Sequence, residues 1–443
     1  PHGTLAAHAL GYTQPITEAE YEILAERGYR IRDRIGRTGV EAAYESHLRG
    51  KWGGQMLEVN AMGEVQRNLG DRPSQPGRDL TLTLDLDLQR VAEQALADKS
   101  GGAVVALDPK DGAILALASR PGFDPNFFSK LITTQEEYDA LFSNPSKPLL
   151  SRAMNPYDPG STWKPVTAMA GMESGKFPPD TKLKTTACIT YGGHCFPDHN
   201  GKGFGTIGYA DALRHSSNTF FYQVGVGVGS LALKQAADQL GFQQKTGIEI
   251  GWEESVGLVG DEPWADRGRG WAEPGTVPWI PEDMASASIG QSVVQITPLQ
   301  LARAYAVFAN GGWLVTPHLA AGTIDWMGSE HRRRVDMQAE TLRTIRHGLR
   351  KVVSAGTGFG LNGPGIPPAA GKTGTAEDST GGPDHAWFGT YAPYPDGEIV
   401  VVAFAQNTPG GGSVHALPMA KKVLAEWERT RGRGLRPPSE PAG

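Results

Sequence analysis

The 443-residue sequence has little cysteine, no long apolar segment and no excess of positive charge. Its best apolar run is Ile399–Ala405, far short of the ~18 residues that a membrane-spanning helix needs. Lys and Arg number 42 against 48 Asp and Glu, a net charge of −6. The chain therefore has no overall positive field for nucleic acid or anionic lipid, and we expect no nucleic-acid partner.

Cysteine occurs twice, as the close pair Cys188 and Cys195. A small hairpin disulfide in an oxidising compartment is the favoured interpretation, and a buried reduced pair in the cytosol is the second. The third is a metal site, because His194, Asp198 and His199 lie nearby and thiolates with imidazoles are zinc ligands. The spacing matches no standard C-x-x-C pattern, which weakens the metal interpretation.

The first 78 residues are predicted to form a small, irregular domain followed by a linker. The sequence opens with Pro1-His2-Gly3, without Met or an apolar stretch, so we expect a processed or truncated start. A helix is predicted over Thr17–Arg27, with carboxylates in its first turn. Turns around Gly36–Gly39 and a Pro- and Gly-rich stretch at Gln66–Arg78 follow. The alternative is a loop-rich extension of the main core.

Regular patterns begin at residue 79. Leucine alternates with polar residues over Leu80–Leu88, which predicts a half-buried strand. A short helix is expected next, with an apolar face over Val91–Leu96. The apolar runs Gly102–Leu107 and Ala113–Ala118 flank turn-forming residues, so they predict a hairpin.

The rest of the chain is predicted to alternate between helices and strands. Thr297 and Pro298 predict a helix start, and Gly356 predicts a helix end. Helices are expected over Pro298–Asn310, Gln338–Ser354 and Met419–Arg429, and strands over Ala386–Tyr391 and Glu398–Ala405. The order indicates an α+β domain over 79–430, with one mixed sheet closed by distant segments, and a Pro/Arg-rich tail at 431–443.

Several common catalytic motifs are missing. Gly371-Lys372-Thr373 ends like a phosphate-binding loop, but Ile366 stands where that loop needs Gly, and two prolines follow it. Gly358–Gly363 fits a dinucleotide-binding template, yet it follows a predicted helix and precedes a proline. Neither G-x-S-x-G nor H-E-x-x-H occurs. Nucleotide binding, α/β-hydrolase chemistry and zincin chemistry are therefore not predicted.

A serine and a lysine three residues apart, Ser161 and Lys164, form a candidate catalytic pair. On a helix this spacing puts both side chains on one face, so a neutral lysine could take the serine proton. Chance alone supplies roughly one such pair in this chain, and a capping serine beside a solvated lysine is the alternative. The preceding Asp158-Pro159-Gly160 is a turn that would place Ser161 near a helix N-terminus.

Two further motifs follow in order. Ser216-Ser217-Asn218 lies at a polar break before an apolar run, where its alternative is an ordinary helix cap. Lys372-Thr373-Gly374-Thr375 precedes a predicted strand, and a glycine there permits close approach of a ligand backbone. Lys245-Thr246-Gly247 is a rival for the last motif, but it lies soon after Asn218 in a predicted turn and lacks the second Thr.

Together the motifs S-x-x-K, S-x-N and K-T-G-T resemble those of penicillin-binding proteins and serine β-lactamases. His8–Tyr12 and Arg37–Glu41 resemble the N-terminal pedestal domain of class B penicillin-binding proteins, and within them the elongation-specific subclass, penicillin-binding protein 2. Tyr157–Ser161 resembles the start of their transpeptidase domain. The resemblance implies mixed helices around an antiparallel sheet, with a truncated pedestal before it.

The resemblance also implies a reaction: cross-linking of peptidoglycan stem peptides that end in D-Ala-D-Ala, through a serine acyl-enzyme. Ser161 would be the nucleophile, which β-lactam antibiotics would also acylate. Lys164 would be the general base, its pKa lowered by burial and by the charge of Lys372. The other implied roles are proton relay by Ser216, substrate-amide binding by Asn218, carboxylate binding by Lys372, Thr373 and Thr375 beside Gly374, and an oxyanion hole at the N–H groups of Ser161 and Thr375.

Members of this family carry a membrane anchor before the pedestal and work beside a glycosyltransferase of the elongation complex. The resemblance therefore implies a periplasmic domain at the bacterial inner membrane. No cofactor is expected. Some relatives hold zinc through a Cys three residues before the second motif, where this chain has Leu213, so we predict no metal site unless Cys188, Cys195 and His199 form a variant one.

Three other functions stay open. A β-lactam hydrolase or sensor could share the fold, although no E-x-x-L-N stretch lies between Asn218 and Lys372 to supply a deacylating carboxylate. A D-Ala carboxypeptidase would transfer the acyl group to water. A scaffold subunit of the wall-synthesis complex would be inactive.

Overall fold

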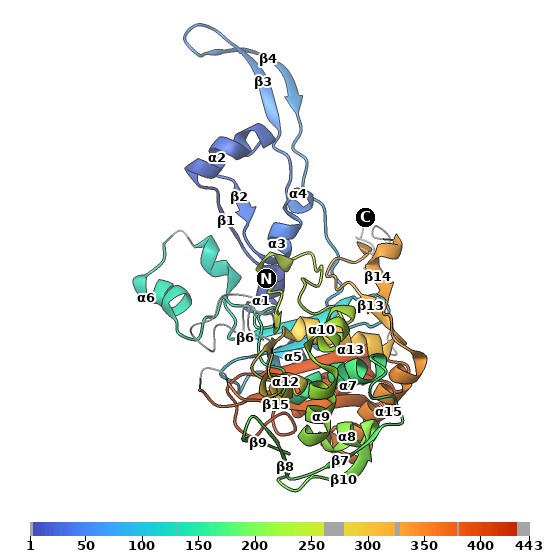
Figure 1. Ribbon diagram of the computed structural model, residues 1–443. Helices are drawn as coiled ribbons and strands as arrows, with labels where there is room; N and C mark the ends of the chain where they lie inside the picture. Colours follow the sequence, from blue (N-terminus) through green and yellow to red (C-terminus); the bar gives the residue numbers. More distant parts are fainter. Residues whose placement is uncertain (1–2, 131, 261–278, 324–327, 379–380, 432–443) are drawn as a thin grey trace.

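The computed structural model describes residues 3–130, 132–260, 279–323, 328–378 and 381–431. Figure 1 shows a broad body of helices and strands from which the N-terminal region and a slender hairpin project. The first two residues and the predicted tail beyond Arg431 lie outside the described residues.

A five-stranded sheet forms the centre of the body, in the order β15-β16-β17-β5-β6. The strands are β5 (Gly102–Leu107), β6 (Ile114–Arg120), β15 (Ala370–Ala376), β16 (His385–Ala392) and β17 (Ile399–Ala405). Every pairing in it is antiparallel, so the mixed sheet expected from the patterning is wrong and the antiparallel one implied by the resemblance is right. Short connections that reverse the chain join β5 to β6, β15 to β16 and β16 to β17, and such connections require antiparallel pairing. The predicted closure by distant segments is confirmed, because β17 pairs with β5.

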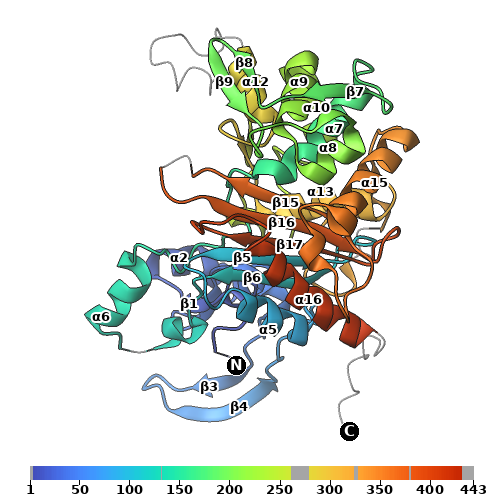
Figure 2. The ribbon, with the colours of Figure 1, turned by 90° about the horizontal axis from the view of Figure 1, so that it is seen from below.

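Helices cover both faces of this sheet (Figure 2). One face carries α5 (Leu86–Ala95) and α16 (Ala416–Thr430), and the other carries α13 (Pro298–Ala309). The helix α15 (Ala339–Ala355) packs against both β15 and α8 (Tyr209–His215). Further helices build a second layer beyond α13: α7 (Lys164–Glu173), α8, α9 (Asn218–Val228), α10 (Ser230–Gln239) and α12 (Pro281–Ser288). The three sequence motifs lie where this layer meets the edge strand β15.

The predicted long helices are confirmed, for the expected reasons. Thr297 caps α13 and forms a capping box with Gln300, and every residue of this helix is buried. Along α15 the buried positions include Leu342, Ile345 and Leu349, spaced to form one apolar face. The hairpin β5–β6 and the strands β16 and β17 are also confirmed.

The strand predicted over Leu80–Leu88 is wrong. Leu82 makes a single bridge to Ala320, and Asp85 then caps α5 by accepting the backbone N–H groups of Asp87 and Leu88. The alternating leucines have another cause: Leu80, Leu82 and Leu84 pack against the core from an irregular segment. A capping carboxylate inside the run stops a strand there, because it favours helix formation from the next residue.

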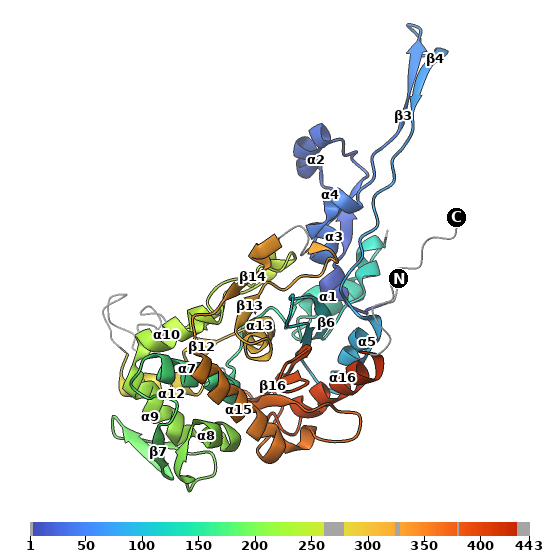
Figure 3. The ribbon, with the colours of Figure 1, turned by 90° about the vertical axis from the view of Figure 1, so that its right-hand side faces the viewer.

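The N-terminal region contains short elements: α1 (Ala7–Leu10), β1 (Thr13–Pro15), α2 (Glu18–Leu24), η1 (Ala25–Arg27), β2 (Arg34–Gly36), α3 (Gly39–Ala43), α4 (Glu45–Leu48), β3 (Gly54–Val59) and β4 (Val65–Arg72). The helix predicted at Thr17–Arg27 is confirmed as α2 followed by η1. Figure 3 shows the hairpin β3–β4 projecting away from the body. The Tyr44 hydroxyl joins this region to the body by donating to Glu249 Oε1 at 3.0 Å. The boundary at residue 78 stays a prediction.

The remaining short elements are one α-helical turn, several 3₁₀ or π turns and small strand pairs. They are η2 (Pro125–Ser129), α6 (Gln135–Tyr138), η3 (Asp139–Ser143), η4 (Gly160–Trp163), β7 (Lys182–Thr185), β8 (Cys188–Tyr191), β9 (His194–Pro197), β10 (Gly205–Gly208), η5 (Gly251–Glu253), β11 (Leu258–Val259), β12 (Val294–Gln295), β13 (Trp313–Val315), η6 (Gly328–His331), β14 (Arg332–Arg334) and η7 (Phe359–Leu361). Within the described ranges, no helix is long and apolar enough to span a bilayer.

Cys188 and Cys195 form a disulfide across the β8–β9 hairpin, with their Cα atoms 5.8 Å apart. The favoured prediction is thereby confirmed. Because the bond uses both sulfur atoms, the reduced pair and the variant site with cysteine thiolates as zinc ligands are wrong.

Candidate active site

A cleft of about 560 Å³ lies between the helical layer and β15. Residues of all three predicted motifs line it: Ser161, Ser216, Asn218, Thr373, Gly374 and Thr375. Three segments far apart in the sequence therefore share one cleft. Its other walls include Tyr222, Gln291 and Thr357.

Ser161 lies in η4, the turn that leads into α7, as the sequence predicts. Buried hydrogen bonds fix this turn: the Tyr305 hydroxyl donates to the Thr162 carbonyl at 3.0 Å, and Trp387 Nε1 donates to the Asp158 carbonyl at 2.9 Å. Gly160 has a φ of +53°, and a Cβ on it would stand 2.2 Å from the Thr375 carbonyl oxygen. Glycine is therefore needed for this turn to approach β15.

Lys164 follows at the start of α7 and is fully buried. Its Nζ donates to the Ser216 carbonyl at 2.6 Å, to Asn218 Oδ1 at 2.7 Å and to Ser216 Oγ at 3.2 Å. Burial lowers the pKa of this amine from 10.5 to about 7, against the opposing charge of Asp198. A large share of the Lys164 amine is therefore neutral near pH 7, as a general base requires.

Ser216 stands between two lysines. It occupies the left-handed junction of α8 and α9, with a φ of 56°. Its Oγ accepts from Lys164 at 3.2 Å and from Lys372 at 2.8 Å. Burial and the charge of Lys164 hold the pKa of Lys372 well below its usual value. This chain of polar atoms can pass a proton between the first and second motifs.

The third motif forms β15, at the edge of the sheet. Lys372 is fully buried behind the cleft, whereas Thr375 is exposed to it. Gly374 lies so close to the Ser161 turn that a Cβ would stand 2.8 Å from the Pro159 carbonyl oxygen. An edge strand with one unpaired side can bind an extended peptide by adding a strand.

The rival motif at Lys245 lies elsewhere. Lys245 Nζ donates to the Gly251 carbonyl at 2.8 Å, in a loop after α10, and its residues do not line the cleft.

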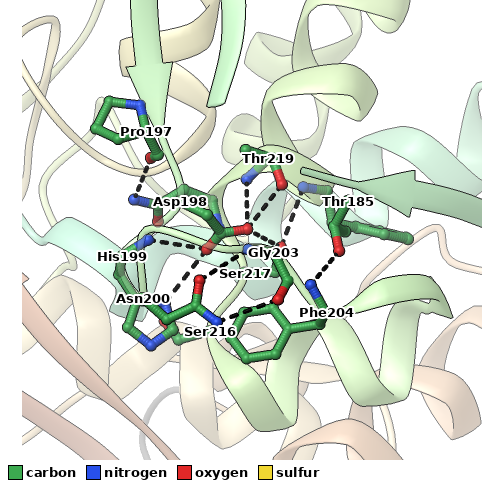
Figure 4. Close-up of polar contacts among 12 residues, drawn as sticks. Thr185, Pro197, Asp198, His199, Asn200, Gly203, Phe204, Ser216, Ser217 and Thr219 are labelled. Carbon is green, nitrogen blue, oxygen red and sulfur yellow. Dashed lines mark hydrogen bonds and ion pairs between the residues drawn. The ribbon is translucent and has the colours of Figure 1, made fainter. Parts of the chain in front are cut away.

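Sequence reasoning missed two residues of this site. The Thr357 hydroxyl shares a 2.7 Å hydrogen bond with the Thr373 hydroxyl on the wall of the cleft. Thr357 directly precedes Gly358–Gly363, which was weighed only as a dinucleotide-binding template, and no motif includes Thr357 itself. Asp198 was considered only as a metal ligand, yet Figure 4 shows its carboxylate bonded to the second motif, with Ser217 Oγ at 2.6 Å from Oδ2.

Comparisons with known proteins agree with this geometry. The penicillin-binding protein transpeptidase domain family matches residues 102–425, and the penicillin-binding protein dimerisation domain family matches residues 1–82. The peptidoglycan D,D-transpeptidase MrdA of Acinetobacter baumannii is 35% identical over 99% of this chain and 67% of its own length. The MrdA of Haemophilus influenzae is 33% identical over 96% of this chain and 68% of its own length.

Solved structures give the same result. PBP2 of Helicobacter pylori, in its complex with MreC, aligns with a TM-score of 0.85 and 26% identity over 98% of this chain and 79% of that one. PBP2 of Pseudomonas aeruginosa, in complex with WCK 5153, aligns with a TM-score of 0.82 and 31% identity over 96% of this chain and 89% of that one. The chain therefore belongs to the class B penicillin-binding proteins of the PBP2 type, a family of serine-type peptidoglycan D,D-transpeptidases.

Proposed function

We propose that Ser161 is the nucleophile with which this chain cross-links peptidoglycan stem peptides, and that Lys164 is its general base. The observation that carries the assignment is the convergence of three motifs on one cleft, with Ser216 Oγ between the amines of Lys164 and Lys372. The lowered pKa of Lys164 supports its role, because a base must be neutral to accept a proton.

In the first half-reaction Ser161 Oγ attacks the carbonyl carbon of the penultimate D-Ala, and its proton passes to Lys164 Nζ. The peptide bond to the terminal D-Ala breaks. Its nitrogen takes the proton from Lys164 through Ser216, so free D-Ala leaves and a serine ester remains. The contact of Ser216 Oγ with both lysines supports this relay.

In the second half-reaction an amine of a neighbouring stem attacks the ester. Lys164 takes the amine proton and returns it to Ser161 Oγ as the ester bond breaks, which leaves a new amide between the stems. We assign the oxyanion hole to the N–H groups of Ser161 and Thr375, a role worth about 3–4 kcal/mol per donor. Both residues line the cleft.

Asn218, Lys372, Thr373, Gly374 and Thr375 are the proposed substrate-binding residues. The amide of Asn218 faces the cleft while holding Lys164. The two threonine hydroxyls and the lysine suit a terminal carboxylate, and Gly374 allows close approach of the peptide backbone. β-Lactams would acylate Ser161 in place of the stem peptide.

We also propose that the chain acts on the outer face of the inner membrane, held there by a membrane anchor and paired with a glycosyltransferase of the elongation complex. A structure described as the coordination of polymerization and crosslinking by a peptidoglycan synthase complex supports this, since it aligns with a TM-score of 0.79 and 34% identity over 98% of this chain. The H. pylori relative in complex with MreC supports a role in a larger assembly.

Labelling with a fluorescent penicillin tests the assignment. Wild type should be labelled covalently, and Ser161→Ala and Lys164→Ala should lose labelling by a factor of at least ~10³. The two K-T-G motifs provide a matched pair: Lys372→Ala should be impaired, whereas Lys245→Ala should label as wild type does. Labelling of Ser161→Ala would overturn the nucleophile, and an unlabelled wild type would favour a scaffold.

A pentapeptide donor separates transfer from hydrolysis. With an acceptor amine present, wild type should form the cross-linked dimer and release D-Ala. Release of D-Ala at the full rate with water as the only acceptor would instead indicate a carboxypeptidase, and rapid hydrolysis of the penicillin ester would indicate a β-lactam hydrolase.

A further inference from the structure

Asp198 lies outside the three motifs, on the loop after β9, yet its carboxylate is bonded to the second motif (Figure 4). Oδ1 accepts the backbone N–H of Asn218 at 3.0 Å. Oδ2 accepts the hydroxyl protons of Ser217 at 2.6 Å and Thr219 at 2.7 Å, and the Thr219 N–H at 3.3 Å. The residue is 2% exposed.

These donors all belong to the first turn of α9 or to its cap. Burial alone would raise the pKa of Asp198, but hydrogen bonds from His199, Ser217, Thr219 and Asn218 hold it well below its usual value. A full negative charge is thus fixed at the N-terminus of α9, where free N–H groups and the helix dipole favour it.

The turn that Asp198 holds supplies the acceptors for the Lys164 amine. Lys164 Nζ donates to the Ser216 carbonyl at 2.6 Å and to Asn218 Oδ1 at 2.7 Å. Ser216 itself has a left-handed backbone, with a φ of 56°, which a residue other than glycine adopts only under constraint from its surroundings. Asp198 bonds to the two residues after Ser216 on one side, and its own N–H bonds to the Ala187 carbonyl at 2.9 Å on the other.

We infer that Asp198 is a positioning residue for acylation: by holding the Ser216–Asn218 turn it keeps the Lys164 amine aimed at the nucleophile. The inference rests on the proposed roles of Ser161 and Lys164. Asp198 itself is covered by the turn it binds, so it acts through Asn218 and Ser216. Its loss should therefore slow the chemical step and leave substrate binding nearly intact.

The primary test is Asp198→Asn, which keeps the shape of the side chain and removes its charge. Stopped-flow acylation by a fluorescent penicillin gives the rate at saturation and the half-saturating concentration separately. We expect the saturated rate to fall about 10- to 100-fold, the range that misplacement of a catalytic group produces. The half-saturating concentration should change less than about threefold.

Asp85→Asn is the matched control. Asp85 also caps a helix, accepting the N–H groups of Asp87 and Leu88 at 2.9 Å each, but this helix is α5 on the opposite face of the sheet. Asn caps a helix about as well as Asp does, so both variants keep a cap and lose the negative charge at a helix N-terminus. A general effect of losing that charge should therefore appear in both variants. Asp85→Asn should keep the wild-type acylation rate.

A double-mutant cycle separates positioning from a structural role. If Asp198 acts through Asn218, then the double variant Asp198→Asn/Asn218→Ala should acylate less than about threefold more slowly than Asn218→Ala alone. Thr219→Val removes one hydroxyl donor without changing the side-chain shape, and should slow acylation about two- to fivefold. It serves as the test if Asp198→Asn does not fold.

The inference is overturned if Asp198→Asn acylates at the wild-type rate, or if Asp85→Asn is as slow as Asp198→Asn. It is also overturned if the fold-loss in acylation rate of the double variant equals the product of the fold-losses of Asp198→Asn and Asn218→Ala. If Asp198→Asn does not fold, acylation of Thr219→Val at the wild-type rate overturns the inference instead. These results differ from failure of the proposed function, in which wild type itself is unlabelled or Ser161→Ala is labelled.

Discussion

The cleft lined by the three motifs and the β3–β4 hairpin depart from the usual rules of burial in opposite directions. Beside the cleft, two lysines, Lys164 and Lys372, are buried at 0% exposure. The hairpin exposes large apolar side chains, with Met62 at 84% and Met56 at 65%, and every residue of its two strands is exposed. Both arrangements are unfavourable in a folded chain taken alone.

The two regions differ in the contacts that their unusual side chains make with the rest of the protein. The two buried lysines donate hydrogen bonds to residues from other segments of the chain. The same burial lowers the pKa values of their amines, on which the proposed chemistry depends. In the hairpin, β3 pairs only with β4 among the described elements, and no core cluster includes its side chains. Changes of pH, and substitutions in the cleft, should therefore alter the acylation rate strongly. Substitutions in the hairpin should leave that rate unchanged.

Among the tests of this contrast between cleft and hairpin, the largest expected effect is the pH dependence of acylation. Lys164 acts as a base only when neutral, and its pKa is about 7. Below that value the neutral fraction falls about tenfold per pH unit, so the acylation rate should be about 100-fold lower at pH 5 than on the plateau above pH 8. Stopped-flow acylation over this range, with circular dichroism to confirm folding at each pH, provides the measurement. A flat rate between pH 5 and 8 would rule out Lys164 as the base.

The second effect concerns stability. The folded pKa of Lys164 lies below its unfolded value of 10.5, so between about pH 7 and 10.5 the unfolded chain binds the extra proton. Wild type should therefore gain stability as pH rises through this window, by about 1.4 kcal/mol per unit relative to Lys164→Met. Chemical denaturation at pH 7.5, 8.5 and 9.5 measures the difference in unfolding free energy between wild type and Lys164→Met.

The exposed Lys110 supplies the control for this experiment. Lys110→Met makes the same chemical change at an exposed position, so a pH-dependent loss of stability that is specific to Lys164→Met can be assigned to the buried amine. Parallel stability curves for wild type and Lys164→Met would contradict burial of a neutral amine.

Fold prediction from the sequence succeeded where the signal was local. The helix α13 and the hairpin β5–β6 each combine a capping or turn signal with the right hydrophobic period. The run at Leu80–Leu88 failed because Asp85 within it caps a helix, and three of its leucines reach the core without pairing as a strand. Periodicity alone does not distinguish these cases.

The site was predictable to the extent that its residues form short motifs. Ser161, Ser216 and Lys372 could be named from spacing and family resemblance, and the structure places them around one cleft. Asp198 and Thr357 could not, since neither belongs to a motif. The side-chain partners of Asp198 lie 19 and 21 residues further along the chain, and Thr357 bonds to a residue 16 positions away. Only the folded chain brings such partners together.

The smallest expected effect concerns the hairpin. Met62→Ser and Val65→Thr replace apolar side chains that are 84% and 58% exposed, and surface substitutions of this kind change stability by about 0.5 kcal/mol or less. Acylation should stay within about twofold of wild type, because the hairpin contributes no residue to the cleft. Penicillin acylation and thermal unfolding of the double variant measure both quantities. A tenfold loss of acylation in a stably folded variant would show that the hairpin is coupled to the cleft, and the contrast between the two regions would then fail.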